Sequence, residues 1–149
     1  MNKLDYDILR IVQNNSRLTA EAISNEVNLS PAAVQKRLKN LRDSGVIEKE
    51  VAVLSANCLG RNMTIIVHVI LERENIASFN QFKLKILKAS CVQQCYYTTG
   101  ESDFIMILLL RDIEEYERFT QEYFFGDSNI VRFTTSIVMN RIKVSLNVI

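Results

Sequence analysis

The stretch from Thr19 to Ile47 constrains the fold of this chain more than any other part of the sequence. It contains two short helical patterns separated by a tight turn. The second pattern begins at Ser30-Pro31, because serine can cap the free N–H groups of a helix and proline suits the first helical position. The residues that then recur at helical spacing and form one apolar stripe are Val34, Leu38 and Leu41. Two short helices in this arrangement predict a helix-turn-helix.

The surface of the second helix away from this stripe is basic. The whole chain carries a net charge of only +1, but between residues 30 and 43 four basic side chains stand against Asp43 alone. Such a local patch suits phosphate binding; an ordinary solvated helix face is the alternative explanation. Its place in a helix-turn-helix favours double-stranded DNA. The residues predicted to contact DNA are Ser30, Ala32, Ala33, Gln35, Lys36, Arg37 and Lys39.

These residues suit different parts of the DNA. Small side chains at Ala32 and Ala33 would let the helix approach base edges closely. Gln35 can offer a donor and an acceptor to an adenine, although it can equally face solvent. Lys36 and Lys39 suit phosphate contacts better than base contacts.

Around this motif, the 149 residues suffice for one large domain or two small ones. We expect a winged helix-turn-helix domain over residues 1–50, a linker or hinge strand over 51–62, and a second domain over 63–149. In the first domain Asp5 is placed to cap an initial helix, and Asn28 falls where a turn needs a residue tolerant of positive φ. Loose alternation over 46–54 predicts a strand or small wing.

The second domain alternates strand-like and helix-like segments. Strands are expected at 63–71, 92–99, 104–110 and 130–141, the last with a continuation to Ile149 left open. Helices are expected at 75–88 and from Asp112, with Glu115 as its reciprocal cap. The order β-α-β-β-α-β predicts a ferredoxin-like unit, so the whole chain belongs to the α+β class.

Two of the expected strands are apolar on both alternating faces, at residues 64–71 and 105–110. An antiparallel sheet usually buries one face and exposes the other to water. The two helices of this fold cover only one face, so something else must cover the second. Another copy of the same sheet is the simplest candidate, which predicts a homodimer.

Several functional classes find no support in the sequence. The chain has no apolar run behind Met1 that resembles a signal peptide, and its longest apolar runs are far shorter than the roughly 20 residues that span a bilayer. Three cysteines without a secretion signal fit a reducing cytoplasm. Cys91, Cys95 and the lone His68 are too few for a structural zinc site, and we find no catalytic constellation. We therefore expect a cytoplasmic protein with no membrane association, catalytic residues, metal or cofactor.

Taken together, the motifs resemble those of the Lrp/AsnC family, the feast/famine transcription regulators of bacteria and archaea. The matching segments cover nearly the whole chain: LDYDIL at 4–9, NSRLT at 15–19, NLSPAAVQKRLKNLRDSGVI at 28–47 and TTGESDF at 98–104. One departure is Asn28, where the family commonly has glycine. Another is the short leader before Asp5, which leaves little chain for an arm into the minor groove.

The resemblance implies an N-terminal winged helix-turn-helix and a C-terminal ferredoxin-like domain for effector binding and oligomerisation. Family members form dimers through their sheets and often assemble into tetramers or octamers. Their effectors are usually amino acids, held between dimers near the glycine-acid turn. The residues expected to bind an effector are Thr98, Thr99, Gly100, Glu101, Asp103, Thr134, Thr135 and Ser136.

At this turn Asp103 would hold an ammonium group, and backbone N–H groups around Gly100 would hold a carboxylate. A simple hairpin turn would also explain these residue types. The predicted function is a DNA-binding transcriptional regulator on a palindromic operator, whose assembly or DNA affinity responds to a small molecule; in view of the family this would be an amino acid. The alternatives are an amino-acid-binding module or a ferredoxin-like enzyme without a DNA role, and the leading helix-turn-helix argues against both.

Overall fold

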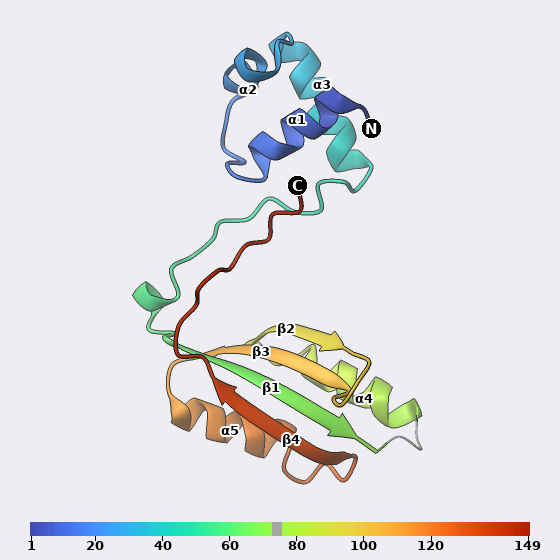
Figure 1. Ribbon diagram of the computed structural model, residues 1–149, viewed down its shortest axis with the longest axis vertical. Helices are drawn as coiled ribbons and strands as arrows, with labels where there is room; N and C mark the ends of the chain where they lie inside the picture. Colours follow the sequence, from blue (N-terminus) through green and yellow to red (C-terminus); the bar gives the residue numbers. More distant parts are fainter. Residues whose placement is uncertain (73–75) are drawn as a thin grey trace. The chain divides into compact units, whose positions relative to one another are not determined.

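The computed structural model describes residues 1–72 and 76–149, and its contacts divide the chain into two units (Figure 1). The first unit contains Met1–Val53 together with the C-terminal segment Lys143–Ile149, and the second contains Leu54–Ile142. The C-terminal segment joins the first unit through hydrogen bonds. The backbone N–H of Val148 donates to Gln13 Oε1 at 3.1 Å, and Asn147 Nδ2 donates to Asn14 Oδ1 at 2.8 Å.

Three helices form the first unit: α1 (Lys3–Val12), α2 (Ala20–Val27) and α3 (Pro31–Asp43). Each begins at a side-chain cap, supplied by Asn2, Thr19 and Ser30 respectively. The predicted start at Ser30-Pro31 is thus confirmed. Asn28 ends α2 in the left-handed conformation, with φ of 52°, as its position in the turn predicted.

The cap of α1 corrects the sequence-based expectation. Asn2, not Asp5, is the capping residue, and Asp5 completes a capping box by accepting the N–H of Asn2 at 2.8 Å. Asp5 also accepts a 2.6 Å hydrogen bond from Arg37 on α3, so it links two helices. The backbone N–H of Asn2, together with the Arg37 guanidinium, holds the pKa of Asp5 below its usual range.

A small apolar core holds these helices together. The buried side chains are Ile8, Ile23, Val27, Val34 and Leu38. They come from all three helices. Of the apolar stripe predicted on α3, Val34 and Leu38 belong to this core, and Leu41 is also buried. The apolar residues whose helical spacing identified the helices in the sequence therefore also form the core of this unit.

The strand or wing predicted over 46–54 is not formed. Residues 48–54 lie in an extended, exposed segment without strand pairing, and Val53 is 92% exposed. A strand requires a hydrogen-bonding neighbour, and no described segment pairs with this one. At the start of the predicted segment, the N–H of Ile47 donates to Leu41 O at 3.0 Å. A short 3₁₀ turn, η1 (Asn57–Leu59), lies near the start of the second unit.

The second unit confirms the ferredoxin-like order. Its elements are β1 (Met63–Leu71), α4 (Ile76–Ile86), β2 (Val92–Tyr97), β3 (Phe104–Leu110), α5 (Ile113–Tyr123) and β4 (Ile130–Ile137). The strands form one antiparallel sheet in the order β2-β3-β1-β4. The first residue of the predicted helix 75–88 lies outside the described residues, and the observed helix ends two residues before 88.

Three further details of this unit differ from the prediction. β2 ends at Tyr97 instead of Thr99. β4 ends at Ile137 instead of Arg141 and does not continue to Ile149. Its partner β1 begins at Met63. The N–H of Val138 donates the last hydrogen bond of this pairing to Thr64 O, so β1 has no further residues to pair with the chain beyond this point. At α5, Asp112 caps the helix as predicted, but Glu115 accepts the N–H of Arg111 rather than that of the cap.

The helices α4 and α5 cover one face of this sheet (Figure 1). The core between them and the sheet contains alternate residues of the two central strands, among them Val67 and Met106, both fully buried. The opposite face, called the open face below, carries Ile66 and Ile70 of β1 with Ile105, Ile107 and Leu109 of β3, all partly exposed. No helix in the described part of the chain is long and apolar enough to cross a membrane.

The link between Asp5 and Arg37 leads to a prediction about stability. Because the folded-state pKa of Asp5 is lowered, its contribution is fully present above its unfolded pKa of about 4 and is lost as the pH falls through the folded value. Asp5→Asn should lower the unfolding free energy of the first unit by about 1–2 kcal/mol at pH 7. The difference from wild type should shrink below about pH 4. Urea denaturation followed by helical circular dichroism measures both effects.

Asp7→Asn is the matched control for this experiment. Asp7 lies on the same helix, but its ion pair is with Arg10, at 3.5 Å, and the Arg10 side chain is 64% exposed. Such a surface pair contributes less than about 0.5 kcal/mol, so this variant should unfold nearly like wild type. Equal destabilisation by the two substitutions would contradict a specific role for Asp5.

Candidate functional site

The exposed side of α3 is the candidate DNA-binding surface. Ala32, Gln35, Lys36 and Lys39 are all exposed, and their spacing places them on one side of the helix. Ser30 Oγ accepts the N–H of Ala33 at 3.2 Å and so fixes the start of the helix, while Ala33 itself is partly buried. The first turn therefore presents small side chains, which permit close approach to another surface.

Arg37 lies apart from this exposed set. Its Nη1 donates to Asp5 Oδ1 at 2.6 Å and to Asn2 Oδ1 at 3.2 Å, and its side chain is 28% exposed. The guanidinium thus joins α3 to the start of α1. Arg42, which also contributed to the basic patch in the sequence, pairs with Glu50 at 2.9 Å. The basic side chains that remain on the candidate surface are Lys36 and Lys39. The sequence pattern did not indicate that Arg37 pairs with Asp5 or that Arg42 pairs with Glu50.

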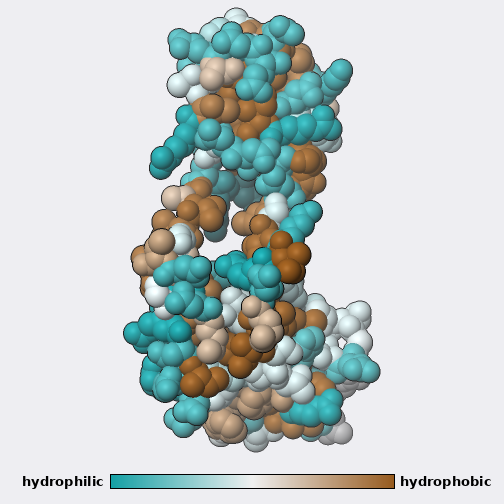
Figure 2. Space-filling view, turned by 60° about the vertical axis from the view of Figure 1, so that its left-hand side comes forward, coloured by the Kyte–Doolittle hydropathy of each residue, from teal (hydrophilic) through white to brown (hydrophobic). Residues whose placement is uncertain are grey.

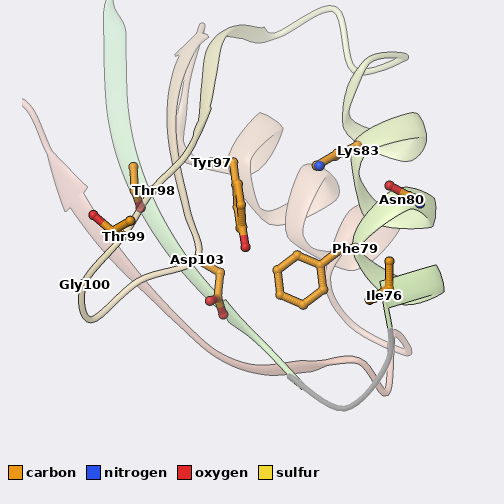
Figure 3. Close-up of a pocket in the computed structure, with 9 residues that line it drawn as sticks. All are labelled: Ile76, Phe79, Asn80, Lys83, Tyr97, Thr98, Thr99, Gly100 and Asp103. Atoms are coloured by element: carbon orange, nitrogen blue, oxygen red, sulfur yellow. The ribbon is translucent and has the colours of Figure 1, made fainter.

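In the second unit, a cavity of about 520 Å³ lies between α4 and the β2–β3 turn (Figure 3). We call it the helix-side pocket. Its walls include four of the predicted effector residues, Thr98, Thr99, Gly100 and Asp103. Sequence reasoning missed its other lining residues, which are Ile76, Phe79, Asn80, Lys83 and Tyr97. Helical spacing shows that the α4 residues share one side, but only the fold brings that side to the turn.

The remaining predicted effector residues lie elsewhere. Glu101, Thr134 and Ser136 line a separate cavity of about 310 Å³, together with His68 and Arg132. Thr134 and Ser136 pair with His68 and Ile66 in the sheet, so this second cavity lies on the open face. Thr135 points to the helix-covered face instead, where its Oγ1 and the Tyr116 hydroxyl form a hydrogen bond of 2.5 Å.

Asp103 anchors the turn to the sheet. It is 6% exposed, and its Oδ2 accepts the backbone N–H of Leu71 at 2.8 Å. Its own N–H donates to Val69 O, and its carbonyl accepts the N–H of Thr98. Gly100, at the tip of the turn, has φ of 112°, a conformation that favours glycine. The carboxylate therefore holds the wall of the helix-side pocket in place as well as contributing negative charge to it.

Cys91 and His68 show no arrangement for catalysis in the described part of the chain, and Cys58 and Cys95 are exposed. Burial raises the pKa of the Cys91 thiol, which makes the reactive thiolate scarce. His68 Nδ1 lies 3.3 Å from Ser102 Oγ on the open face. Among the described residues, no three His, Cys, Asp or Glu side chains gather in a way that would hold a metal ion.

Sequence comparisons identify both parts of the chain. Residues 1–48 match the profile of a winged helix-turn-helix DNA-binding domain, and residues 64–148 match that of the Lrp/AsnC ligand binding domain. The HTH-type transcriptional regulator y4tD of Sinorhizobium fredii is 43% identical over 148 residues, which cover 99% of this chain and 88% of that protein. Transcriptional regulator AzlB of Bacillus subtilis is 30% identical over 148 residues, 99% of this chain and 94% of AzlB.

A solved structure supports the same assignment. The transcriptional regulator NMB0573 of Neisseria meningitidis, in a complex with L-Met, superimposes with a TM-score of 0.94 at 26% identity. The match covers 99% of this chain and 96% of that one. These relatives are transcriptional regulators and not enzymes, so the ferredoxin-like enzyme considered as an alternative is excluded.

The exposed side of α3 yields a prediction about DNA affinity. Replacing both Lys36 and Lys39 by glutamine should remove two phosphate contacts, so the slope of log K against log salt should become shallower by about 2. Binding should weaken across different DNA sequences, since phosphate contacts carry no sequence information. Fluorescence anisotropy titrations at several salt concentrations measure both the slope and the affinity.

Lys88→Gln is the matched control, because Lys88 is an exposed lysine of the other unit. It should leave the salt slope unchanged. An unchanged slope in the Lys36 and Lys39 double variant would show that the docking surface lies elsewhere.

Proposed function

Because this chain belongs to the Lrp/AsnC family of DNA-binding transcriptional regulators, we propose that it binds a palindromic operator as a homodimer and responds to an amino acid. Its DNA-binding part is the helix-turn-helix and its ligand-binding part is the ferredoxin-like domain. We further propose that it acts in the cytoplasm, where its DNA target lies. We also propose functional limits of residues 1–50 for DNA binding, a linker over 51–62, and residues 63–149 for effector binding and oligomerisation. Within the last range, Lys143–Ile149 makes its contacts with the first unit.

The open face of the sheet supports the homodimer. Its centre is apolar, with Ile66, Ile105 and Ile107 side by side on two paired strands. No described element of the chain covers these residues, and a second copy of the sheet would bury them. A two-fold axis between the copies would pair two helix-turn-helix units, which is why a palindromic operator follows. Further assembly of such dimers into a tetramer or octamer is consistent with this arrangement.

A substitution that introduces a charge at the centre of the open face tests the proposed dimer. Ile107→Asp should leave the core intact, because this side chain lies on the face opposite the helices, but should raise the dimer dissociation constant at least about a hundredfold. Sedimentation velocity at micromolar concentration measures the shift to monomer. Gln121→Asp, at an exposed position on α5, should sediment like wild type. A wild-type chain that is already monomeric at this concentration would contradict the proposal.

The helix-side pocket supports an amino-acid effector. It brings together the Asp103 carboxylate, which suits an ammonium group, and a glycine-containing turn whose N–H groups suit a carboxylate. The similar regulator from Neisseria meningitidis was solved in a complex with L-Met, an amino acid. The single observation that carries this proposal is the gathering of Thr98, Thr99, Gly100 and Asp103 around one cavity.

Binding at this pocket would regulate DNA binding through linkage. A ligand that binds one assembly state more tightly than another shifts the population toward that state. A coupling free energy of about 1–3 kcal/mol gives a five- to 150-fold change in DNA affinity, which suffices for a switch. The open-face cavity, with Glu101, Thr134 and Ser136, would then lie at the dimer contact, where it would not bind the same ligand molecule as the helix-side pocket.

Two substitutions at Asp103 separate its structural role from ligand binding. Asp103→Asn removes the charge and keeps an oxygen that can accept the Leu71 N–H, so the protein should stay folded while amino-acid affinity falls at least about tenfold. Asp103→Ala leaves that buried N–H unsatisfied and should cost about 1–3 kcal/mol of stability. Thermal-shift titrations with the twenty amino acids, and gel shifts with the responding ones, measure these effects. Wild-type affinity in Asp103→Asn would contradict the ammonium contact.

A further inference from the structure

We propose that α4 selects the side chain of the effector: it accepts large apolar side chains and, through Lys83, rejects basic ones. This inference rests on the proposed function, since it concerns the ligand of the same pocket. It assigns a specificity role to residues that the family motif in the sequence did not include.

The wall that α4 contributes is a single stripe. Ile76, Phe79, Asn80 and Lys83 follow one another at spacings of three or four residues, which places them on one side of the helix. This stripe and the turn at 98–100 line the same cavity. A ligand whose charged groups bind the turn would therefore extend its side chain toward α4 (Figure 3).

The middle of the pocket is aromatic. The rings of Phe79 and Tyr97 meet nearly perpendicularly, with centroids 5.7 Å apart. Both rings also pack against Phe104, which is 1% exposed and belongs to the core. The aromatic wall is therefore fixed by the core of the unit and does not depend on a ligand for its position.

Apolar surface next to this wall is left in contact with water. Ile76 is 82% exposed and Tyr97 is 63% exposed, although both line a cavity. Burying such surface under an apolar ligand group is favourable by about 25 cal/mol per Å². The pocket thus favours a large apolar side chain over a small or strongly hydrated one.

Lys83 places a positive charge at the far side of the aromatic pair. Its Nζ lies 5.1 Å from the centroid of the Tyr97 ring, a cation–π distance. In Figure 3 the Phe79 and Tyr97 rings lie between the Asp103 carboxylate and the Lys83 ammonium. A ligand side chain that starts at the turn and crosses the rings would end near Lys83, where a second cation would be repelled.

Charge reversal at Lys83 tests this selection directly. Isothermal titration calorimetry would compare L-methionine, L-leucine and L-phenylalanine with L-lysine and L-arginine. Wild type should bind the three apolar amino acids at least about tenfold more tightly than the two basic ones. Lys83→Glu should shift that ratio by tenfold or more toward the basic pair. Lys83→Met, which keeps an apolar stem over Tyr97, should weaken the rejection of basic side chains while keeping apolar binding.

Two further variants complete the design. Lys88→Glu makes the same change in net charge at an exposed lysine that does not line the pocket, so it should keep the wild-type ranking of ligands. Ile76→Ser changes an exposed side chain without touching the core, and it should weaken the apolar amino acids several-fold. Because all of the substituted side chains are exposed, melting curves of the unliganded variants should match wild type.

The outcomes separate this inference from the function on which it rests. If wild type binds apolar amino acids and Lys83→Glu keeps the same ranking, the role of Lys83 is wrong and the amino-acid effector stands. Equal binding of basic and apolar amino acids by wild type would overturn the side-chain selection as a whole. If none of the twenty amino acids binds wild type, the proposed effector itself is wrong, and this inference falls with it.

Discussion

Two helices can cover only one face of a four-stranded sheet, and here both faces of its central strands are apolar. Residues such as Val67 and Met106 are completely buried under α4 and α5, while Ile66 and Ile107 on the reverse stay partly exposed. Because helices cover only one face, the sheet has two distinct surfaces, one under the helices and one open. The helix-side pocket and the open face lie on opposite sides of the sheet, so ligand binding and pairing with a second copy would not compete for the same residues.

Most of the fold could be predicted from local signals in the sequence. The cap at Ser30, the left-handed Asn28, and the alternation in β1 and β3 each depend on a few neighbouring residues, and all were predicted. The cap of α1 was misassigned by three residues, to Asp5 instead of Asn2, and the strand boundaries were wrong where structure depends on a partner. The segment 46–54 alternates like a strand but has no described neighbour to pair with, and β4 stops where β1 begins. Alternation shows that a segment suits a sheet and does not show that a sheet is present beside it.

The candidate site was predictable to a lesser extent, because its members are distant in sequence. Arg37 has the charge that suits a DNA contact, and its ion pair with Asp5, 32 residues away, could not be seen in the sequence pattern. Thr134, Thr135 and Ser136 are consecutive, and alternation in a strand sends them to opposite faces. Asp103 was identified from its place in the turn, whereas the hydrogen bond that it accepts from the Leu71 N–H could be seen only in the structure. Figure 2 adds that hydrophobic and hydrophilic residues are interspersed on the visible surface, which gives no simple guide to either site.

The division of the chain into units has a consequence for its evolution and its handling. Lys143–Ile149 belongs to the unit that contains the helix-turn-helix, although 89 residues of the other unit separate it from Val53. By its contacts the DNA-binding unit is thus discontinuous, although the match to the ligand binding domain extends to residue 148. A fragment cut at the end of the first unit would lose the hydrogen bonds that Gln13 and Asn14 make to the C-terminal segment. Exchange of ligand-binding domains between relatives would accordingly have to preserve two junctions with the DNA-binding unit, at both ends of the exchanged segment.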